Sequence, residues 1–313
     1  MKRAIVFPGQ GSQSVGMGKE LAANFGTAKL VFEEVDSALS QNLSRIMFDG
    51  PEADLTLTEN AQPAIMASSI ALLRVLEQET GFNPTAYGHY FAGHSLGEYT
   101  ALAAAGSLTL ADTARLLKTR GKAMQKAVPV GEGAMAAILG LEFDQIAAIV
   151  AEASETGICA IANDNSPGQV VVSGTTAAVN KAVELAKEKG AKRSVLLPVS
   201  APFHSPMMQP AADVMAGALA TVTVNAPSLP VIANVTAQPV NSPDDIRKLL
   251  VEQVTGMVRW RESMLQAATL GVTQVLEIGV GKVLTGLAKR IDKNLEATCV
   301  ASVEDIKAFK VAA

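Results

Sequence analysis

Residues 93–97 read GHSLG, a G-x-S-x-G motif of the kind that presents a serine hydroxyl for nucleophilic attack. The motif requires a strand before it and a helix after it. The run from Tyr87 to Ala92 is apolar and aromatic, which predicts a strand, and the run from Glu98 to Ala105 is rich in alanine and leucine, which predicts a helix. Ser95 would then stand at the tip of a sharp turn, beside helical N–H groups that favour a developing anion.

A serine nucleophile needs a base, and the chain offers three histidines, His89, His94 and His204. His94 adjoins Ser95, so its side chain should point elsewhere than that of Ser95, and His89 lies in the predicted strand. His204 stands between two prolines that stiffen its segment, which makes it the best placed base. The alternative for His204 is a structural histidine whose ring is bonded by backbone groups.

The Gly-rich segment PGQGSQ at residues 8–13 follows a short predicted strand at residues 4–7. It lacks the Walker lysine and the G-x-G-x-x-G spacing of a phosphate-binding loop. Two interpretations remain equally open. The turn either presents a backbone N–H group to an oxyanion or simply joins a strand to a helix.

Arg120 and Lys118 lie at the two edges of the apolar stripe of a predicted helix over 109–127, each about 80° from its centre. Either cation could face a cleft. Periodicity alone favours the interpretation of Arg120 as an edge residue that extends its charge into solvent. Gln62, next to Pro63 at the predicted start of another helix, could be a simple polar loop residue.

The elements around these residues alternate between strands and helices, which favours an α/β fold with a mostly parallel sheet. Residues 129–133 look like a linker. The predicted elements between 135 and 199 run strand, helix, strand, strand, helix, strand, and this βαββαβ order is typical of a ferredoxin-like unit. We therefore expect a large α/β domain from residues 1–128 and 201–313, with a small ferredoxin-like domain, residues 129–200, inserted in it.

Composition argues against several other classes. The 313 residues are 49% hydrophobic, enough for a sizeable core, and the net charge of −4 argues against general nucleic-acid binding as a function. Cys159 and Cys299 lie far apart without metal-ligand spacing, so we expect neither a disulfide framework nor a metal site. The N-terminal apolar run is too short for a signal peptide and no run approaches a membrane span, so we expect a soluble cytoplasmic protein without membrane contact.

Several separate stretches, in the right order over nearly the full length, resemble malonyl-CoA:acyl-carrier-protein transacylases, the acyltransferases of type II fatty acid synthesis. These stretches are GQGSQ (residues 9–13), AQP (61–63), GHSLGEY (93–99), the helix that carries Arg120, APFHS (201–205) and EIG (277–279). The FHS form at residues 203–205 resembles the malonyl-selective version. Val280 departs from the proline that is usual there, in a turn.

The resemblance implies a hydrolase-like large domain, a ferredoxin-like small domain and an active site in the cleft between them. It implies that Ser95 is the nucleophile and that His204 is its general base. In this family the main-chain carbonyl at the position of Gln253, instead of an aspartate, orients the histidine. The N–H groups of Gln10 and Leu96 would form the oxyanion hole.

For the substrate, the resemblance implies that Arg120 binds the free malonyl carboxylate and that Gln62 lines the pocket. A planar guanidinium can hold a carboxylate with two parallel hydrogen bonds, which a lysine cannot do. Of Arg120 and Lys118, this chemistry favours Arg120 as the residue that binds the carboxylate. The implied partners are malonyl-CoA and an acyl carrier protein, to whose phosphopantetheine thiol the malonyl group passes through a malonyl-serine intermediate. No metal or bound cofactor is implied.

Other functions remain as alternatives. A serine thioesterase or hydrolase of the true α/β-hydrolase class would carry Ser, then Asp or Glu, then His near the C-terminus, whereas here residues 205–313 follow the last histidine. A non-catalytic module that binds an acyl carrier is disfavoured by the joint presence of Ser95, His204 and Arg120. A malonyltransferase that loads a polyketide or malonate-decarboxylase carrier is the closest rival.

Overall fold

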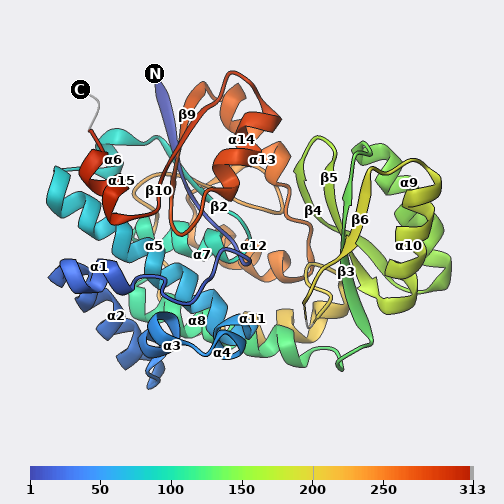
Figure 1. The fold of residues 1–313 in the computed structure, drawn as a ribbon, viewed down its shortest axis with the longest axis horizontal. Coiled ribbons are helices and arrows are strands. Elements are labelled where there is room, and N and C mark those ends of the chain that lie inside the picture. The colour runs from blue at the N-terminus through green and yellow to red at the C-terminus, as the bar shows by residue number, and fades with distance from the viewer. Residues whose placement is uncertain (200, 311–313) are drawn as a thin grey trace.

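The computed structural model describes residues 1–199 and 201–310, in which the chain forms two separate sheets (Figure 1). The larger sheet is mostly parallel, and the smaller one is antiparallel. The predicted mixed α/β fold with a mostly parallel sheet is confirmed. Position 200, at the predicted domain boundary, and residues 311–313 lie outside the described residues.

In the described part of the chain the larger sheet has six strands. Their order is β10 (Glu296–Val300), β9 (Val272–Ile278), β1 (Lys2–Phe7), β2 (Tyr90–Gly93), β7 (Val231–Ile232) and β8 (Pro239–Val240). Neighbouring strands are parallel except β7 and β8. The nucleophile motif thus follows β2, a strand near the middle of the sheet.

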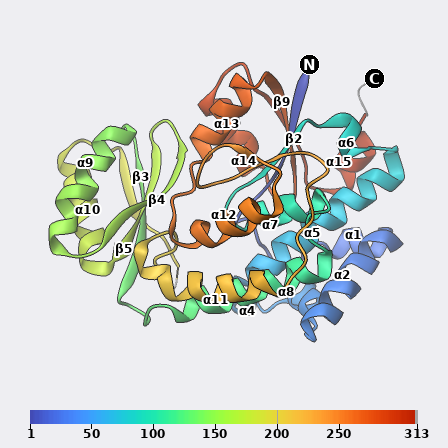
Figure 2. The same cartoon turned by 180° about the vertical axis from the view of Figure 1, so that it is seen from behind.

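Strand β1 is buried on both faces, and its alternate residues enter two different cores. Ile5 and Phe7 face a large apolar cluster, whereas Ala4 and Val6 face a second one. Helices cover both faces of the sheet (Figures 1 and 2). The first cluster is packed by α2 (Gly26–Leu39), α5 (Thr58–Thr80), α7 (Leu96–Ala104), α8 (Leu110–Lys126), α11 (Gln209–Ala220) and α12 (Pro243–Thr255), and the second by α13 (Trp260–Thr269) and α14 (Val283–Ile291).

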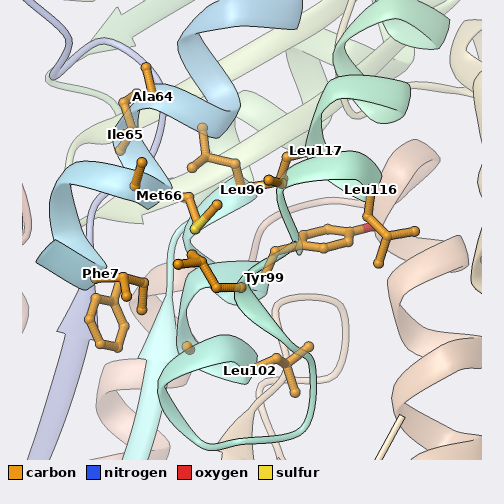
Figure 3. Close-up of a cluster of buried hydrophobic side chains, with 14 of the residues drawn as sticks. Phe7, Ala64, Ile65, Met66, Leu96, Tyr99, Leu102, Leu116 and Leu117 are labelled. Atoms are coloured by element: carbon orange, nitrogen blue, oxygen red, sulfur yellow. The ribbon is translucent and has the colours of Figure 1, made fainter. Parts of the chain in front are cut away.

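Helix α7 is buried between its neighbours. Figure 3 shows Tyr99 and Leu102 of this helix among apolar side chains that include Met66 of α5 and Leu117 of α8. Tyr99 and Leu117 have no exposed surface. The apolar burial of α7 holds the turn that precedes it in place.

The smaller sheet has the strand order β4 (Cys159–Ser166), β5 (Gln169–Thr175), β3 (Gly133–Leu139) and β6 (Arg193–Leu196). Helices α9 (Phe143–Ala153) and α10 (Thr176–Glu188) pack on it around an apolar core of their own. Along the chain the elements run β3-α9-β4-β5-α10-β6, which is the order that the sequence predicts.

Several predicted boundaries are wrong, among them the following three. Strand β2 begins at Tyr90 instead of Tyr87. Tyr87 is the last residue of a short helix, α6 (Pro84–Tyr87), whose start is capped by the side chain of Asn83, and Gly88 and His89 connect this helix to the strand. The sequence predicts a strand over 158–162 and a turn over 163–168. Strand β4 instead continues to Ser166, with two bulges, and only Pro167 and Gly168 join it to β5.

Helix α5 begins at Thr58, well before its predicted start at Ala64, so Pro63 lies inside the helix. Gly121 of α8 packs against the backbone of Glu59, where any larger residue would collide. Tertiary packing of this first turn therefore overrides the local signal of the proline.

Among the described residues the prediction also omits α1 (Lys19–Asn24), α3 (Leu43–Asp49), α4 (Glu52–Thr56), α6, α11, α15 (Val303–Ala308) and β8. No helix of the described residues is long and apolar enough to cross a membrane.

Candidate active site

Ser95 stands between β2 and α7 with φ 54° and ψ −111°, a strained backbone conformation. The glycines on either side make this turn possible. A Cβ at Gly93 would collide with the backbone of Gly97, and a Cβ at Gly97 would collide with the carbonyl of Phe7. Helix α7 therefore packs directly on the end of β1, which brings Ser95 beside the Gly-rich turn at residues 8–13.

His204 reaches Ser95 from a segment far away in the sequence. Its Nε2 lies 2.8 Å from Ser95 Oγ, and the residue itself has φ 54° and is almost fully buried. Its Nδ1 lies 2.9 Å from the carbonyl oxygen of Gln253 and 3.1 Å from that of Gly256. Because a carbonyl oxygen only accepts, Nδ1 carries the proton and Nε2 is free to accept the serine proton.

The electrostatics around His204 keep its ring neutral. Burial, and next the charge of Arg120, lower the pKa of His204 to about 3. The carbonyls of Gln253 and Gly256 lie at the C-terminal end of α12, where helix carbonyls lack intrahelical partners and carry partial negative charge. They stand where a hydrolase triad would have a carboxylate.

Arg120 projects from α8 into the same site and is 1% exposed. Its Nη1 donates to Gln62 Oε1 at 2.8 Å, and its Nη2 donates to Gln253 Oε1 at 2.8 Å and to Ser95 Oγ at 3.2 Å. No carboxylate forms a salt bridge with Arg120 within the part of the chain that the structure describes. A buried cation without such a partner is suited to an anionic ligand.

Lys118, which periodicity could not separate from Arg120, has a different environment. Its Nζ donates to Glu59 Oε1 at 3.3 Å and to Asn60 Oδ1 at 2.8 Å. The lysine charge is thus already paired on the flank of α5. The interpretation of Arg120 as an edge residue that extends into solvent is wrong, because α5 and α12 close over it.

One cavity of about 610 Å³ is lined by Ser95, His204, Arg120, Gln62 and Gln10. Met135 of β3 and Asn163 of β4 bring the smaller sheet to this cavity, and its apolar wall also includes Met124, Leu197, Val199 and Phe203. The structure thus brings these five residues, which come from five separate segments of the chain, to one cavity. Gln253 lies behind it, fully buried.

The two expected oxyanion donors lie on either side of Ser95. Leu96 is the first residue of α7, so no intrahelical carbonyl can accept from its N–H group. Gln10 belongs to the turn that follows β1, and its neighbour Gly9 approaches so closely that an added Cβ would lie 2.8 Å from the carbonyl oxygen of His94. The Gly-rich turn is thus held against the nucleophile turn.

The other two histidines do not contact the serine hydroxyl. Nε2 of His94 lies 2.8 Å from Asn165 Oδ1 in β4, as expected of a side chain that points elsewhere. His89 is exposed and its Nδ1 lies 3.4 Å from the N–H nitrogen of Arg3. Of the three histidines, His204 is the one placed to act as a base for Ser95.

Comparison with known proteins agrees with this geometry. The family described as acyl transferase domain matches residues 4–311. The chain belongs to the acyl transferase family. Among its acyl transferase relatives, a protein of Bacillus subtilis (strain 168) is 45% identical over 307 residues (98% of this chain, 95% of that protein), and one of Escherichia coli (strain K12) is 46% identical over 297 residues (95% of each). Both are named malonyl CoA-acyl carrier protein transacylase.

Solved acyl transferase structures are also similar. An acyl-carrier-protein-S-malonyltransferase from Bartonella henselae is 57% identical, with a TM-score of 0.96 over 98% of each chain. A malonyl-transacylase in complex with its type II PKS acyl-carrier protein is 41% identical, with a TM-score of 0.94 over 98% of each chain. The resemblance drawn from the sequence motifs is thus confirmed.

Sequence reasoning missed two polar residues of this acyl transferase site. Asn234 accepts from the N–H of Ser95 at 2.7 Å and donates to the carbonyl of Gly93 at 2.7 Å, which fixes the strained turn. Glu98 accepts from the N–H of Asn234 at 3.1 Å. The S-x-x-E spacing from Ser95 to Glu98 is a helix-start signal that could have drawn attention to Glu98, whereas the segment around Asn234 carries no comparable signal.

Proposed function

We propose that this acyltransferase moves a malonyl group from malonyl-CoA to the phosphopantetheine thiol of an acyl carrier protein. The observation that carries the proposal is the buried guanidinium of Arg120, 3.2 Å from Ser95 Oγ and without a carboxylate partner among the described residues. An acyl group that ends in a carboxylate would supply an anion in direct contact with this guanidinium. The names of the relatives support the same substrate and the same kind of carrier.

In the first half-reaction, Ser95 Oγ attacks the thioester carbonyl while His204 Nε2 takes the hydroxyl proton. The carbonyl of Gln253, 2.9 Å from Nδ1, holds the ring and stabilises the imidazolium that forms. The C–S bond then breaks, and His204 returns the proton to the departing thiolate of coenzyme A. The carrier thiol reverses these steps, so the malonyl group leaves Ser95 and the free serine is restored.

The tetrahedral intermediate carries a negative charge on its oxygen. We propose that the N–H groups of Gln10 and Leu96 bind this oxyanion, each contributing about 3 kcal/mol of transition-state stabilisation. The closeness of Gly9 to His94 supports this role, because the absence of a side chain at residue 9 lets the turn that carries Gln10 pack directly against the turn that carries Ser95.

Arg120 would bind the free malonyl carboxylate through two parallel hydrogen bonds. Gln62 and Gln253 each hold one terminal nitrogen of the guanidinium, so its plane is set before the substrate arrives. An acetyl group would leave the buried guanidinium without a carboxylate in direct contact, and discrimination against acetyl should therefore be large. Acyl exchange between two thiols needs neither a metal nor a redox cofactor, and we propose none.

For the architecture, we propose a hydrolase-like large domain, residues 1–128 and 201–313, and a ferredoxin-like small domain, residues 129–200. The strand order β4-β5-β3-β6 and the separate apolar core of the smaller sheet support this division. The active site would be the cleft between the two domains. Residues of both proposed domains line the cavity, among them Arg120 of the large domain and Met135 of the small one, which supports this placement.

Intact-mass measurement after brief mixing with malonyl-CoA tests the function. A malonyl increment that maps to Ser95 and then moves to the thiol of an added carrier is expected. An increment lost to water equally fast with and without carrier would indicate a hydrolase instead. Because one similar structure holds a polyketide carrier, fatty-acid and polyketide carrier proteins should be compared as acceptors.

A further inference from the structure

Gln253 contacts both the base and the guanidinium of the site. Its main-chain oxygen accepts from His204 Nδ1, and its side-chain Oε1 accepts from Arg120 Nη2 at 2.8 Å. A guanidinium has donors only, so a flipped amide would turn an NH₂ group toward Arg120 and lose that bond. The orientation of the buried amide therefore decides whether Gln253 can hold Arg120.

Two acceptors on the other side of Gln253 determine that orientation. Gln253 Nε2 donates to Glu98 Oε2 at 2.7 Å and to the main-chain oxygen of Ser95 at 2.9 Å. A carbonyl oxygen and an ionised carboxylate only accept, so a flipped amide would set its oxygen against both. The amide oxygen is thereby directed toward Arg120.

Glu98 is itself held firmly. It is 2% exposed and lies in the first turn of α7, where the helix dipole favours a carboxylate. Its Oε2 also accepts from the main-chain N–H of Asn234. Burial raises the pKa of Glu98 to about 7, and the hydrogen bonds from Gln253 and Asn234 act in the opposite direction, in favour of the ionised form.

We propose that Glu98 is a positioning residue for acyl-group selectivity: its carboxylate fixes the amide of Gln253, and Gln253 in turn holds the Arg120 guanidinium for the substrate carboxylate. The inference rests on the proposed function, because it concerns the carboxylate of the transferred malonyl group. Acetyl-CoA has no such carboxylate and does not use this series of contacts.

The test compares malonyl-CoA with acetyl-CoA as acyl donors, by single-turnover acylation followed by intact mass. Glu98→Met removes the acceptor oxygen and should lower kcat/KM for malonyl-CoA by about tenfold to a hundredfold relative to acetyl-CoA, mainly through KM. Glu98→Gln keeps an acceptor oxygen of the same shape and should preserve the malonyl preference within about threefold. Equal losses for both donors in Glu98→Met would overturn the proposal.

A double-mutant cycle locates the effect in Gln253. Gln253→Met keeps the main-chain carbonyl that holds His204, and it should lower the malonyl preference as much as Glu98→Met does. The double variant should lose no more than either single variant, because both changes remove the same contact. If Gln253→Met leaves the malonyl preference unchanged, Glu98 cannot act through this side chain. The Gln253 variant therefore tests the proposal even if Glu98→Met does not fold.

Glu277→Gln is the matched control. Glu277 is a fully buried glutamate that accepts from the N–H groups of Leu284 and Thr285 at the start of α14. The substitution should lower stability without changing the preference for malonyl over acetyl. A wild-type protein without a malonyl adduct on Ser95 would refute the proposed function, whereas a wild-type adduct with unchanged selectivity in Glu98→Met refutes only this inference.

Discussion

The hydroxyl oxygen of Ser95 and Nε2 of His204 lie 2.8 Å apart although 109 positions separate them in the sequence. Both residues have φ 54°, a left-handed conformation that costs about 1–3 kcal/mol for a residue other than glycine. The strained backbone conformation of these two facing residues persists because the contacts around them stabilise it. The carbonyls of Gln253 and Gly256 enforce the ring position on one side, and Asn234 enforces the serine turn on the other.

Removing the base should slow acylation but leave the nucleophile in place. We expect His204→Ala to lower the rate of malonyl-Ser95 formation by about 10²–10⁴-fold, which is the usual contribution of a general base. Rapid-quench intact mass measures this rate. His89→Ala, at an exposed histidine, is the control and should acylate at the wild-type rate. A near-normal rate in His204→Ala would require a different base.

The pH profile should show that His204 is neutral over a wide range. Its pKa is lowered to about 3, chiefly by burial, so the ring remains an unprotonated base well below the ordinary histidine value of 6.5. In a Glu98→Gln background, where the nearby carboxylate no longer titrates, the acylation rate should vary less than about threefold between pH 8 and pH 5. A tenfold fall centred near pH 6.5 would contradict this assignment.

Arg120 should decide the choice of acyl group. Arg120→Ala should lower kcat/KM for malonyl-CoA by about a hundredfold or more, since it removes two charge-assisted hydrogen bonds, and should raise acetyl transfer relative to malonyl transfer. Competition between the two donors, read by intact mass, measures the change. Lys118→Ala removes a cation from the same helix that is paired with Glu59, and it should leave the selectivity unchanged.

Glu98 should make stability depend on pH in an unusual direction. Its folded pKa of about 7 lies above the ordinary value of 4.5, mainly because of burial. Between these two values the folded state binds more protons than the unfolded state, so this carboxyl's contribution to stability is lost as pH rises. Urea unfolding of wild type and Glu98→Gln from pH 5 to pH 8 should therefore show wild type losing stability relative to the variant. A constant difference would refute the raised pKa.

The ion pair between Arg261 and Asp164 joins α13 to β4. Arg261 Nε lies 2.8 Å and 3.0 Å from the two carboxylate oxygens of Asp164, whose side chain is 1% exposed. Arg261→Ala should lower the free energy of unfolding by about 3 kcal/mol, because a buried carboxylate is left unpaired. Lys19→Ala, which breaks an exposed pair with Asp49, should cost less than about 1 kcal/mol in the same urea titration. Equal losses of unfolding free energy in the two variants would show that Asp164 is not a buried, ionised carboxylate.

The local features of this protein were predictable from its sequence. The motif around Ser95 indicated a strand, a tight turn and a helix, because the two glycines and the alanine-rich run act within a few residues of each other. The sequence also predicts a helix over 243–255, because Ser242 and Pro243 are a helix-start signal, and these are the bounds of α12. The order of elements in the small sheet was predictable for the same local reasons.

Only the tertiary structure decided what these segments bring together. Helical periodicity treats Arg120 and Lys118 alike, and the packing of α8 against α5 and α12 buries one and leaves the other beside Glu59. The position of Asn234 and the reach of Glu98 to Gln253 depend in the same way on contacts across more than a hundred residues. Sequence patterns report the periods of single elements, whereas a site assembled from several elements is determined by how their buried faces pack.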